Sequence, residues 1–446
     1  MVFKVERRVC RIRGTVVRSI KKMLVGNGND IMKKSAIWNI ISSMEYSMQS
    51  AILLLVVTRL GGLYDAGLFT IAYTFTQMMA TVGSYGMRSF QVSDVKTEYK
   101  FGTYLYSRVI SVTVMLVACV SYAVIQQYDS KKIFLFFLLC MYRVVDDYED
   151  VFHGEMQKNM RLDIASKIVA IRIFVATVMF AIAYAVSKDI VIACLALTVT
   201  AILVSIVLNA VVIGEFKGIT FKLSRENGIR LLWTCLPICV SGFLYNYLAN
   251  APKYAIDRNL SEEMQTLFSI LFMPIFVINI LSSFIFKPMI ASMGIMWSNK
   301  KYKEFIGSVV KQMLLIVGMT VGIMFFGGLC GVEVLGWMYG VKLTEYRLLF
   351  VLLLTFGGFA ATVAFFVVVL TIVRKQQFIV VAYIVSALTN LLLANKMVLK
   401  HGIWGAGIMY GLTMGMIVIM LLVTFVLTIR KEKRGAHNGA IKEDLS

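Results

Sequence analysis

Charged residues are scarce in this chain. They make up 16% of its 446 residues, against about a quarter in a typical soluble globular protein. Hydrophobic residues make up 59%, and the mean hydropathy is +0.78. Water cannot be the main solvent of such a chain, so an ordinary soluble globular domain is excluded.

Signatures of catalysis are also missing. The chain has no GxxxxGK[ST] run and no segment outside its apolar stretches large enough to hold a nucleotide-binding domain. No cluster of catalytic groups faces the aqueous phase. We therefore expect neither ATP hydrolysis nor any other enzymatic activity in this chain, and no cofactor.

Cysteine and histidine are few and scattered. The seven cysteines show no disulfide or zinc spacing, and His153, His401 and His437 are too far apart in the sequence to suggest a metal site. Five of the cysteines lie in apolar stretches, where they act as small hydrophobic fillers.

Long apolar runs dominate the rest of the sequence. A run of about 20 such residues can cross the hydrocarbon core of a bilayer. Nine runs are uncharged: 66–87, 109–128, 190–214, 231–252, 264–286, 312–332, 348–373, 376–395 and 402–429. Three more, at 36–58, 133–152 and 166–187, carry internal charges. Together they predict an all-α polytopic membrane protein with about twelve transmembrane helices.

The span at 133–152 is the least obvious, because charged residues crowd its second half. The loop charges support it. With both termini cytoplasmic, the segments predicted to face the cytoplasm hold 33 of the 45 lysines and arginines, as the positive-inside rule requires. Omitting this span would invert every later helix and move the basic loops 215–230 and 287–311 outside.

The N-terminal 34 residues are basic and lack a continuous apolar run, so we expect no cleavable signal peptide. Apolar residues recur there every three or four positions, which is typical of an amphipathic helix lying on the cytoplasmic leaflet. They are Val5, Val9, Ile12, Val16, Ile20 and Leu24. A disordered basic tail is the alternative.

The predicted spans form two sets of six. The sequence thus predicts an N-terminal cytoplasmic segment (1–34), an N-lobe (35–214), an inter-lobe loop (215–230), a C-lobe (231–429) and a cytoplasmic tail (430–446). Two parallel repeats would enclose a central cavity near the membrane midplane. The net charge of +20 is spread over the loops and not gathered in one domain, so we expect no nucleic-acid partner.

Ionisable groups within the apolar runs are the first candidates for function, because they are costly at membrane depth. Glu45 lies about ten residues into the first span. It is either a cavity carboxylate that binds a coupling proton or cation, or a partner for Arg143 or Arg172. Those two guanidinium groups suit a phosphorylated substrate, but Asp146 lies three residues from Arg143, which favours structural pairing within the N-lobe.

Other candidates lie near the ends of spans. Lys253, after the seventh span, belongs either to a gating element or to an ordinary solvated turn. Arg88, at the cytoplasmic end of the second span, is either a site for a lipid phosphate or a plain topological anchor. Gly407, Gly411 and Gly415 form a ridge of small residues that allows close helix packing on the last span.

Three segments, 56–94, 153–167 and 246–290, resemble the bacterial polysaccharide-biosynthesis flippases of the multidrug/oligosaccharidyl-lipid/polysaccharide exporter superfamily. They begin VVTRLGGLYDAGLFT, HGEMQKNMRLDIASK and NYLANAPKYAIDRNL. The resemblance implies a protein of the bacterial inner membrane, with two six-helix lobes around a cationic cavity. It also implies alternating-access transfer of an undecaprenyl-pyrophosphate-linked oligosaccharide to the outer leaflet, for O-antigen, capsule or a similar polymer, with membrane lipids, a polymerase and glycosyltransferases as partners.

The first, second, seventh and eighth spans line the cavity in that superfamily, but here they hold few cations. Their main polar groups are Glu45, Gln49, Gln77, Asn246 and Asn279, and Lys33, Lys34, Arg88 and Lys287 lie at their cytoplasmic ends. The sequence therefore favours a cationic cytoplasmic mouth over a cationic centre. The alternatives are an ion-coupled drug or metabolite antiporter of the same fold, a membrane polymerase or ligase, and a scaffold for glycan assembly.

Overall fold

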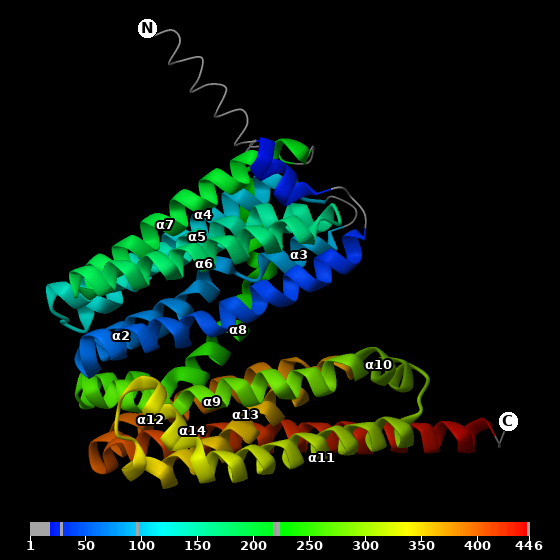
Figure 1. Ribbon diagram of the computed structural model, residues 1–446. Coiled ribbons are helices and arrows are strands. Elements are labelled where there is room, and N and C mark those ends of the chain that lie inside the picture. Colours follow the sequence, from blue (N-terminus) through cyan, green and yellow to red (C-terminus); the bar gives the residue numbers. More distant parts are fainter. Residues whose placement is uncertain (1–17, 27–29, 95–97, 217–218, 220–223, 444–446) are drawn as a thin grey trace, which may run out of the picture. The chain divides into compact units, whose positions relative to one another are not determined.

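The computed structural model describes residues 18–26, 30–94, 98–216, 219 and 224–443. Within these ranges helices are joined by short turns, and there is no strand (Figure 1). Nine of the helices found in these ranges are long and apolar enough to cross a membrane. The chain is therefore an all-α, multi-pass membrane protein, as its composition predicts.

The chain divides into two compact units, Met1–Phe243 and Leu244–Ser446. This division falls within α8, whereas the predicted lobe boundary at 215–230 stays a prediction. The long helices are α2 (Ile31–Ser84), α4 (Phe101–Ile125), α5 (Ser130–Lys158), α6 (Leu162–Ser187), α7 (Ile190–Val212), α8 (Arg225–Asn259), α9 (Glu262–Phe286), α11 (Tyr302–Phe326), α13 (Arg347–Ile372) and α14 (Gln377–Glu443). The shorter ones are α3 (Met87–Ser93), α10 (Ile290–Ser298) and α12 (Val332–Tyr339), with brief turns η1 (Ile213–Glu215), η2 (Lys287–Met289), η3 (Gly327–Gly331) and η4 (Thr344–Tyr346).

Two of these helices each contain two predicted spans. α2 is interrupted at Gly62, where φ is 86°, and α14 at Gly402, where φ is 57°. Glycine adopts positive φ without the steric cost that a side chain would add. Each glycine therefore marks the turn between a pair of predicted spans, and every predicted span coincides with a helical segment of the structure.

The span predicted at 133–152 is confirmed as a helix. α5 is not among the nine helices that are apolar enough to be identified as membrane spans, because it carries many charges. It nevertheless packs against each of α2, α3, α4, α6 and α7. It is thus the central helix of the first unit (Figure 1). Its charges lie inside the bundle, where other helices supply partners.

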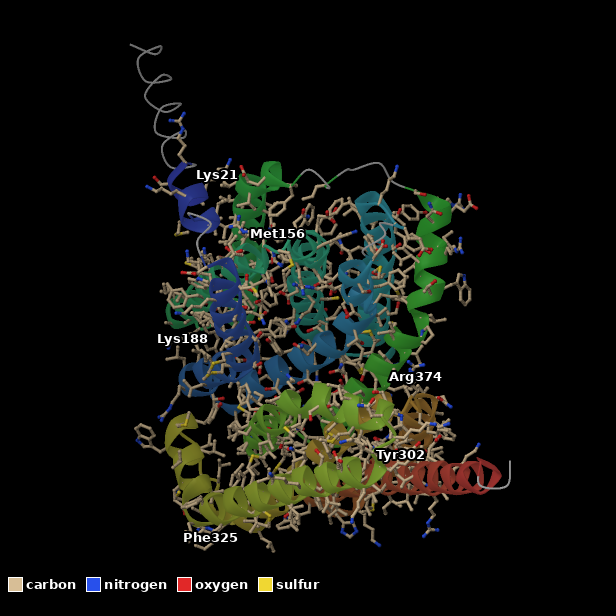
Figure 2. The ribbon with its side chains drawn as sticks, turned by 90° about the vertical axis from the view of Figure 1, so that its right-hand side faces the viewer. Lys21, Met156, Lys188, Tyr302, Phe325 and Arg374 are labelled. Carbon is tan, nitrogen blue, oxygen red and sulfur yellow. The ribbon has the colours of Figure 1, made fainter. Side chains whose placement is uncertain are left out.

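The first unit also holds a short N-terminal helix, residues 18–25. Leu24 is fully buried in an apolar cluster with residues of α5, α6 and α7, including Met156 (Figure 2). The Lys167 ammonium donates to the Leu24 carbonyl (2.9 Å), and the Arg161 guanidinium donates to the Val25 carbonyl (2.6 Å). The two cations thus supply hydrogen-bond donors to carbonyl groups at the C-terminal end of this helix, where the helix itself offers none.

The predicted leaflet-bound helix is therefore wrong for Leu24, whose side chain covers protein and not lipid. The earlier apolar residues of that pattern, from Val5 to Val16, lie outside the described residues. The structure differs from the prediction because the apolar cluster of α5, α6 and α7 provides Leu24 with a surface on its own chain.

The second unit is organised around α13, which packs against α9, α11 and α14. Along α14, two glycines of the predicted ridge approach α13 closely. An added Cβ would lie 2.7 Å from Leu349 at Gly407 and 2.4 Å from the Phe356 ring at Gly411. At Gly415 the nearest atom would be 3.7 Å away, an ordinary contact, so the close part of the ridge is its first two glycines.

Candidate functional site

A polar cavity of about 370 Å³ lies within the first unit, beside α5. Four carboxylates of α5 line it: Asp146, Asp147, Glu149 and Asp150. Arg88 of α3, Arg172 of α6, Tyr46 of α2 and His153 of α5 complete its charged and aromatic wall. Both signs of charge therefore face one hollow inside a membrane bundle.

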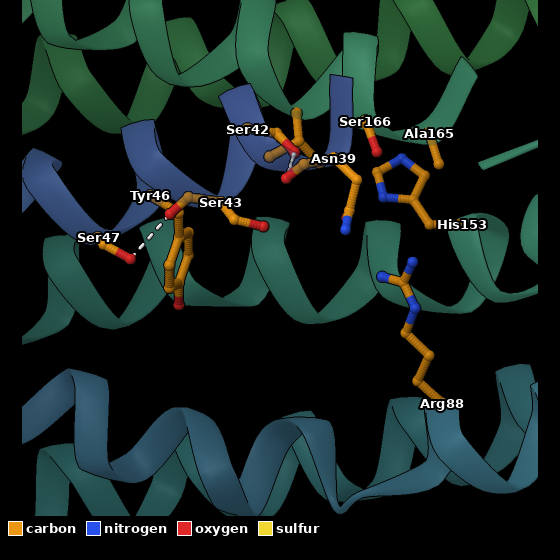
Figure 3. Close-up of a pocket in the computed structure, with 10 residues that line it drawn as sticks. Asn39, Ser42, Ser43, Tyr46, Ser47, Arg88, His153, Ala165 and Ser166 are labelled. Carbon is orange, nitrogen blue, oxygen red and sulfur yellow. Dashed lines mark hydrogen bonds between the residues drawn. The ribbon is translucent and has the colours of Figure 1, made fainter. Parts of the chain in front are cut away.

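A second hollow of about 260 Å³ shares Tyr46, Arg88, His153 and Val169 with the first. Its other polar groups are neutral, and they come from α2 and α6: Asn39, Ser42, Ser43, Ser47 and Ser166. Figure 3 shows the Arg88 guanidinium pointing towards the His153 ring, with Asn39 beside them. The two hollows thus join a charged region to a region of amides and hydroxyls.

Ion pairs tie the charged region to three neighbouring helices. Asp150 accepts from Arg88 at 2.9 Å and from Arg108 of α4 at 2.8 Å. Arg172 pairs with Asp146 at 2.5 Å and with Glu149 at 2.8 Å. Removing one partner of such a buried pair would leave an uncompensated charge, which is strongly destabilising. The network therefore holds α3, α4 and α6 against α5.

Arg143 has a different environment. It pairs with Asp146 at 2.9 Å, so the local pairing predicted from their spacing is confirmed. Its guanidinium also lies over three rings, at 4.5 Å from the centroid of Tyr73, 5.3 Å from Tyr142 and 5.8 Å from Tyr46. Aromatic faces attract a cation where water is excluded. The contacts explain how Arg143 is only 1% exposed.

The amides predicted in the first two spans support this cluster. Gln49 donates to the Tyr142 hydroxyl (2.8 Å) and to Thr177 (3.2 Å), and Gln77 donates to the Tyr46 hydroxyl (3.2 Å). Gln49 is 1% exposed and Gln77 is half-buried. Both therefore position aromatic rings around Arg143 and do not line either hollow.

Glu45 lies next to Tyr46 but lines neither hollow. It is half-buried, and its Oε2 has no hydrogen-bond partner among the described residues. The alternative of an ion pair with Arg143 or Arg172 is wrong, because both guanidinium groups pair with carboxylates of α5. Lys33 and Lys34, in the first turn of α2, also lie outside the hollows.

None of the four predicted residues of the second unit lines either hollow. Lys287 is exposed in η2, and the amide of Asn279 donates to the Ile275 carbonyl of its own helix (3.3 Å). Asn246 is half-buried, and its carbonyl accepts from Asn250 (3.2 Å).

Lys253 does not lie in a solvated turn, which is one of the two alternatives predicted for it. α8 continues to Asn259, and Lys253 is only 7% exposed. Its ammonium lies 5.4 Å from the centroid of the Phe272 ring and 5.8 Å from that of Phe276. These rings provide the cation with a favourable environment inside the bundle, so the helix can continue.

Sequence reasoning missed Arg108, His153 and Asn209 as members of the charged site. Arg108 was assigned to a loop, but α4 begins at Phe101, so Arg108 lies two turns inside it and is 1% exposed. Asn209 of α7 donates to Glu149 (3.1 Å). The available signal is spacing on α5, where polar residues at 143, 146, 147, 150 and 153 recur every three or four positions and share a face.

No family model and no curated protein matches this sequence. Solved structures do share its fold. A multidrug resistance MATE family transporter of the MOP superfamily, in an inward-facing conformation, has a TM-score of 0.67 at 13% identity, covering 89% of this chain and 99% of its own. The lipid II flippase MurJ, in an inward closed conformation, has a TM-score of 0.65 at 12% identity, covering 88% and 90%. A MOP superfamily transporter from Pyrococcus furiosus has a TM-score of 0.57 at 14% identity, covering 93% and 98%.

Proposed function

We propose that this chain is a flippase that moves an undecaprenyl-pyrophosphate-linked oligosaccharide from the cytoplasmic to the outer leaflet of a bacterial inner membrane. The observation that carries the proposal is the pair of joined hollows in the first unit. The larger holds two guanidinium groups among four carboxylates, and the smaller adds one amide and several hydroxyls beside the shared Arg88. A pyrophosphate head bearing sugars needs both kinds of group. The fold shared with the lipid II flippase MurJ supports a lipid-linked cargo.

Arg88 is the guanidinium best placed to meet the pyrophosphate. Its side chain is 32% exposed, while those of Arg143 and Arg172 are nearly fully buried. A guanidinium binds phosphate oxygens through two parallel hydrogen bonds. In the structure Arg88 bonds to Asp150 (2.9 Å) and Gln157 (3.1 Å), so cargo binding exchanges these partners for phosphate oxygens.

The sugars would meet the neutral part of the wall. Hydroxyl and amide groups both donate and accept hydrogen bonds, so they suit sugar hydroxyls. The chain would work by alternating access with both termini cytoplasmic, in line with the distribution of basic loops. Glycosyltransferases that build the cargo and a polymerase that consumes it are the proposed partners.

The test is a flipping assay with the full chain in liposomes that contain a labelled undecaprenyl-pyrophosphate oligosaccharide. An impermeant lectin measures how much label reaches the outer surface. We expect exposure to rise faster than in protein-free vesicles, and Arg88→Gln to slow it. Lys301→Gln, at an exposed lysine paired with Glu304, is the matched control and should flip normally. Exposure no faster than in protein-free vesicles would refute the proposed cargo.

The second candidate is a cation-coupled antiporter for drugs or metabolites. It is favoured by the four carboxylates in the larger hollow, since carboxylates bind cationic compounds, and by the fold shared with a multidrug resistance transporter. Cells lacking the gene would then accumulate a cationic drug, while their surface glycan would assemble normally. The proposed flippase predicts the reverse.

A further inference from the structure

Asp147 differs from the other carboxylates of the larger hollow. Asp146, Glu149 and Asp150 each pair with at least one arginine. The Asp147 Oδ2 has no hydrogen-bond partner among the described residues, and none of the ion pairs found there includes Asp147, although it is only 4% exposed and lines the hollow. Its Oδ2 packs against Gly83, where an added Cβ would lie 1.9 Å away.

A buried carboxylate in this position is costly when ionised. Its desolvation is not offset by a direct cation or a donor. Taking up a proton removes that cost and leaves the packing against Gly83 in place. The hollow beside Asp147 gives the proton a polar route.

Charges face Asp147 from α5 itself and from the helices packed on it. α3 contributes Arg88, α4 Arg108 and α6 Arg172, while α2 contributes Tyr46 and α7 the neutral Asn209. α5 itself contributes Arg143, Asp146, Glu149, Asp150 and His153. With His153 neutral, four arginines face four carboxylates. The cluster is neutral when Asp147 is ionised and carries one positive charge when Asp147 is protonated.

We propose that Asp147 is the proton site of this transporter, and that its proton raises the affinity of the hollow for the pyrophosphate of the cargo. The proposal rests on the proposed function for its ligand and replaces Glu45 as the coupling residue. Neutralising this carboxylate removes one negative charge from the hollow, which should strengthen pyrophosphate binding by on the order of tenfold. Affinity should therefore fall as rising pH removes the proton.

Infrared spectroscopy of the full chain in lipid detects the proton without any ligand. The difference spectrum between low and high pH should contain a protonated-carboxyl band that is absent from Asp147→Asn and present in Glu45→Gln. Asp129→Asn, at the exposed start of α5, is the matched control and should also keep the band. A band that persists unchanged in Asp147→Asn would overturn the proposal. If Asp147→Asn does not accumulate, Asp147→Ala makes the same comparison.

Binding of detergent-solubilised undecaprenyl pyrophosphate tests the linkage. The wild type should lose on the order of tenfold in affinity as pH rises, while Asp147→Asn, which is always neutral there, should bind tightly over the same range. Because the ligand also titrates, the two proteins are compared at each pH. Equal pH dependence in both would overturn the proton site and leave the cargo intact. A wild type that binds no ligand, yet shows the Asp147 band, would refute the cargo and leave the proton site.

Discussion

The central helices of the two units differ sharply. α5 in the first unit carries an arginine, four carboxylates and a histidine from Arg143 to His153, whereas α13 in the second has no ionisable residue after Arg347 in its first turn. α13 meets its neighbours through apolar contacts and close glycines. α5 meets them through ion pairs that reach α3, α4 and α6.

This difference separates two ways of holding a helix in a membrane bundle. Apolar packing gives no specificity for an anionic cargo, while a charged interior is costly unless each charge has a partner. The first unit therefore has the chemistry for binding within its own helices. Among its residues whose burial the structure describes, the second unit offers one buried cation, Lys253, and none of its predicted groups lines either hollow.

The largest effect should come from breaking the buried network. Arg172→Ala would leave Glu149 without a cation and Asp146 with Arg143 alone, at a cost of about 3–5 kcal/mol. Thermal unfolding in detergent would show a large fall in Tm or a failure to accumulate. Arg347→Ala removes an exposed partner of Glu333 in the second unit and should cost less than about 1 kcal/mol. Equal losses would contradict the contrast between the units.

A second prediction concerns helix packing in the second unit, which a larger side chain at Gly411 should disrupt by steric clash. Gly411→Ala places a methyl group 2.4 Å from the Phe356 ring, and forcing the ring aside should cost about 1–3 kcal/mol. Gly415→Ala, one turn later, meets nothing closer than 3.7 Å and serves as its control. Thermal unfolding of both variants measures the difference. If Gly411→Ala unfolds at the wild-type temperature, the close helix contact is not present.

Lys253 should respond in the opposite direction from Arg172. Lys253→Met keeps a long apolar side chain beside Phe272 and removes a buried charge that has no carboxylate partner among the described residues. We expect a gain in stability of about 1 kcal/mol, read as a higher Tm. Flipping should slow if this ammonium also contacts the cargo. A loss of stability like that of Arg172→Ala would reveal an anionic partner.

The smallest effect concerns a carboxylate outside the spans. Burial acts to raise the pKa of Asp94, but the amides of Tyr99 and Glu98 and the Tyr104 hydroxyl donate to its carboxylate and lower the pKa overall. A lowered folded-state pKa gives stability that is present above the unfolded pKa of about 3.9 and is lost as pH falls through the folded pKa. Because Asp94 is partly exposed, this should be less than about 1 kcal/mol.

Unfolding of the wild type and Asp94→Asn, measured from pH 7 downwards, isolates this contribution. The difference between the two proteins should be constant near neutral pH and shrink on acidification. A difference that grows as pH falls would show that the sign is wrong.

Much of the fold could be predicted, because transmembrane helices are encoded by the length of apolar runs and the side of basic loops. Even α5 could be inferred, since the loop charges require its crossing. The partners of its charges could not. Asp150 pairs with Arg88 and Arg108, which are 62 and 42 positions away, and only helix packing brings them together. Likewise, the sequence around Lys253 does not predict its contacts with the Phe272 and Phe276 rings of α9.

The docking of Leu24 has a consequence for synthesis. Residues 18–25 are synthesised long before α7, yet the cluster that buries Leu24 includes Leu208 and Val212 near the end of α7. At about 5–20 residues per second, that part of the cluster follows roughly 10–40 s later. During this interval the apolar cluster around Leu24 still lacks its α7 side chains. Leu24 can therefore take its buried position only after α7 has been made.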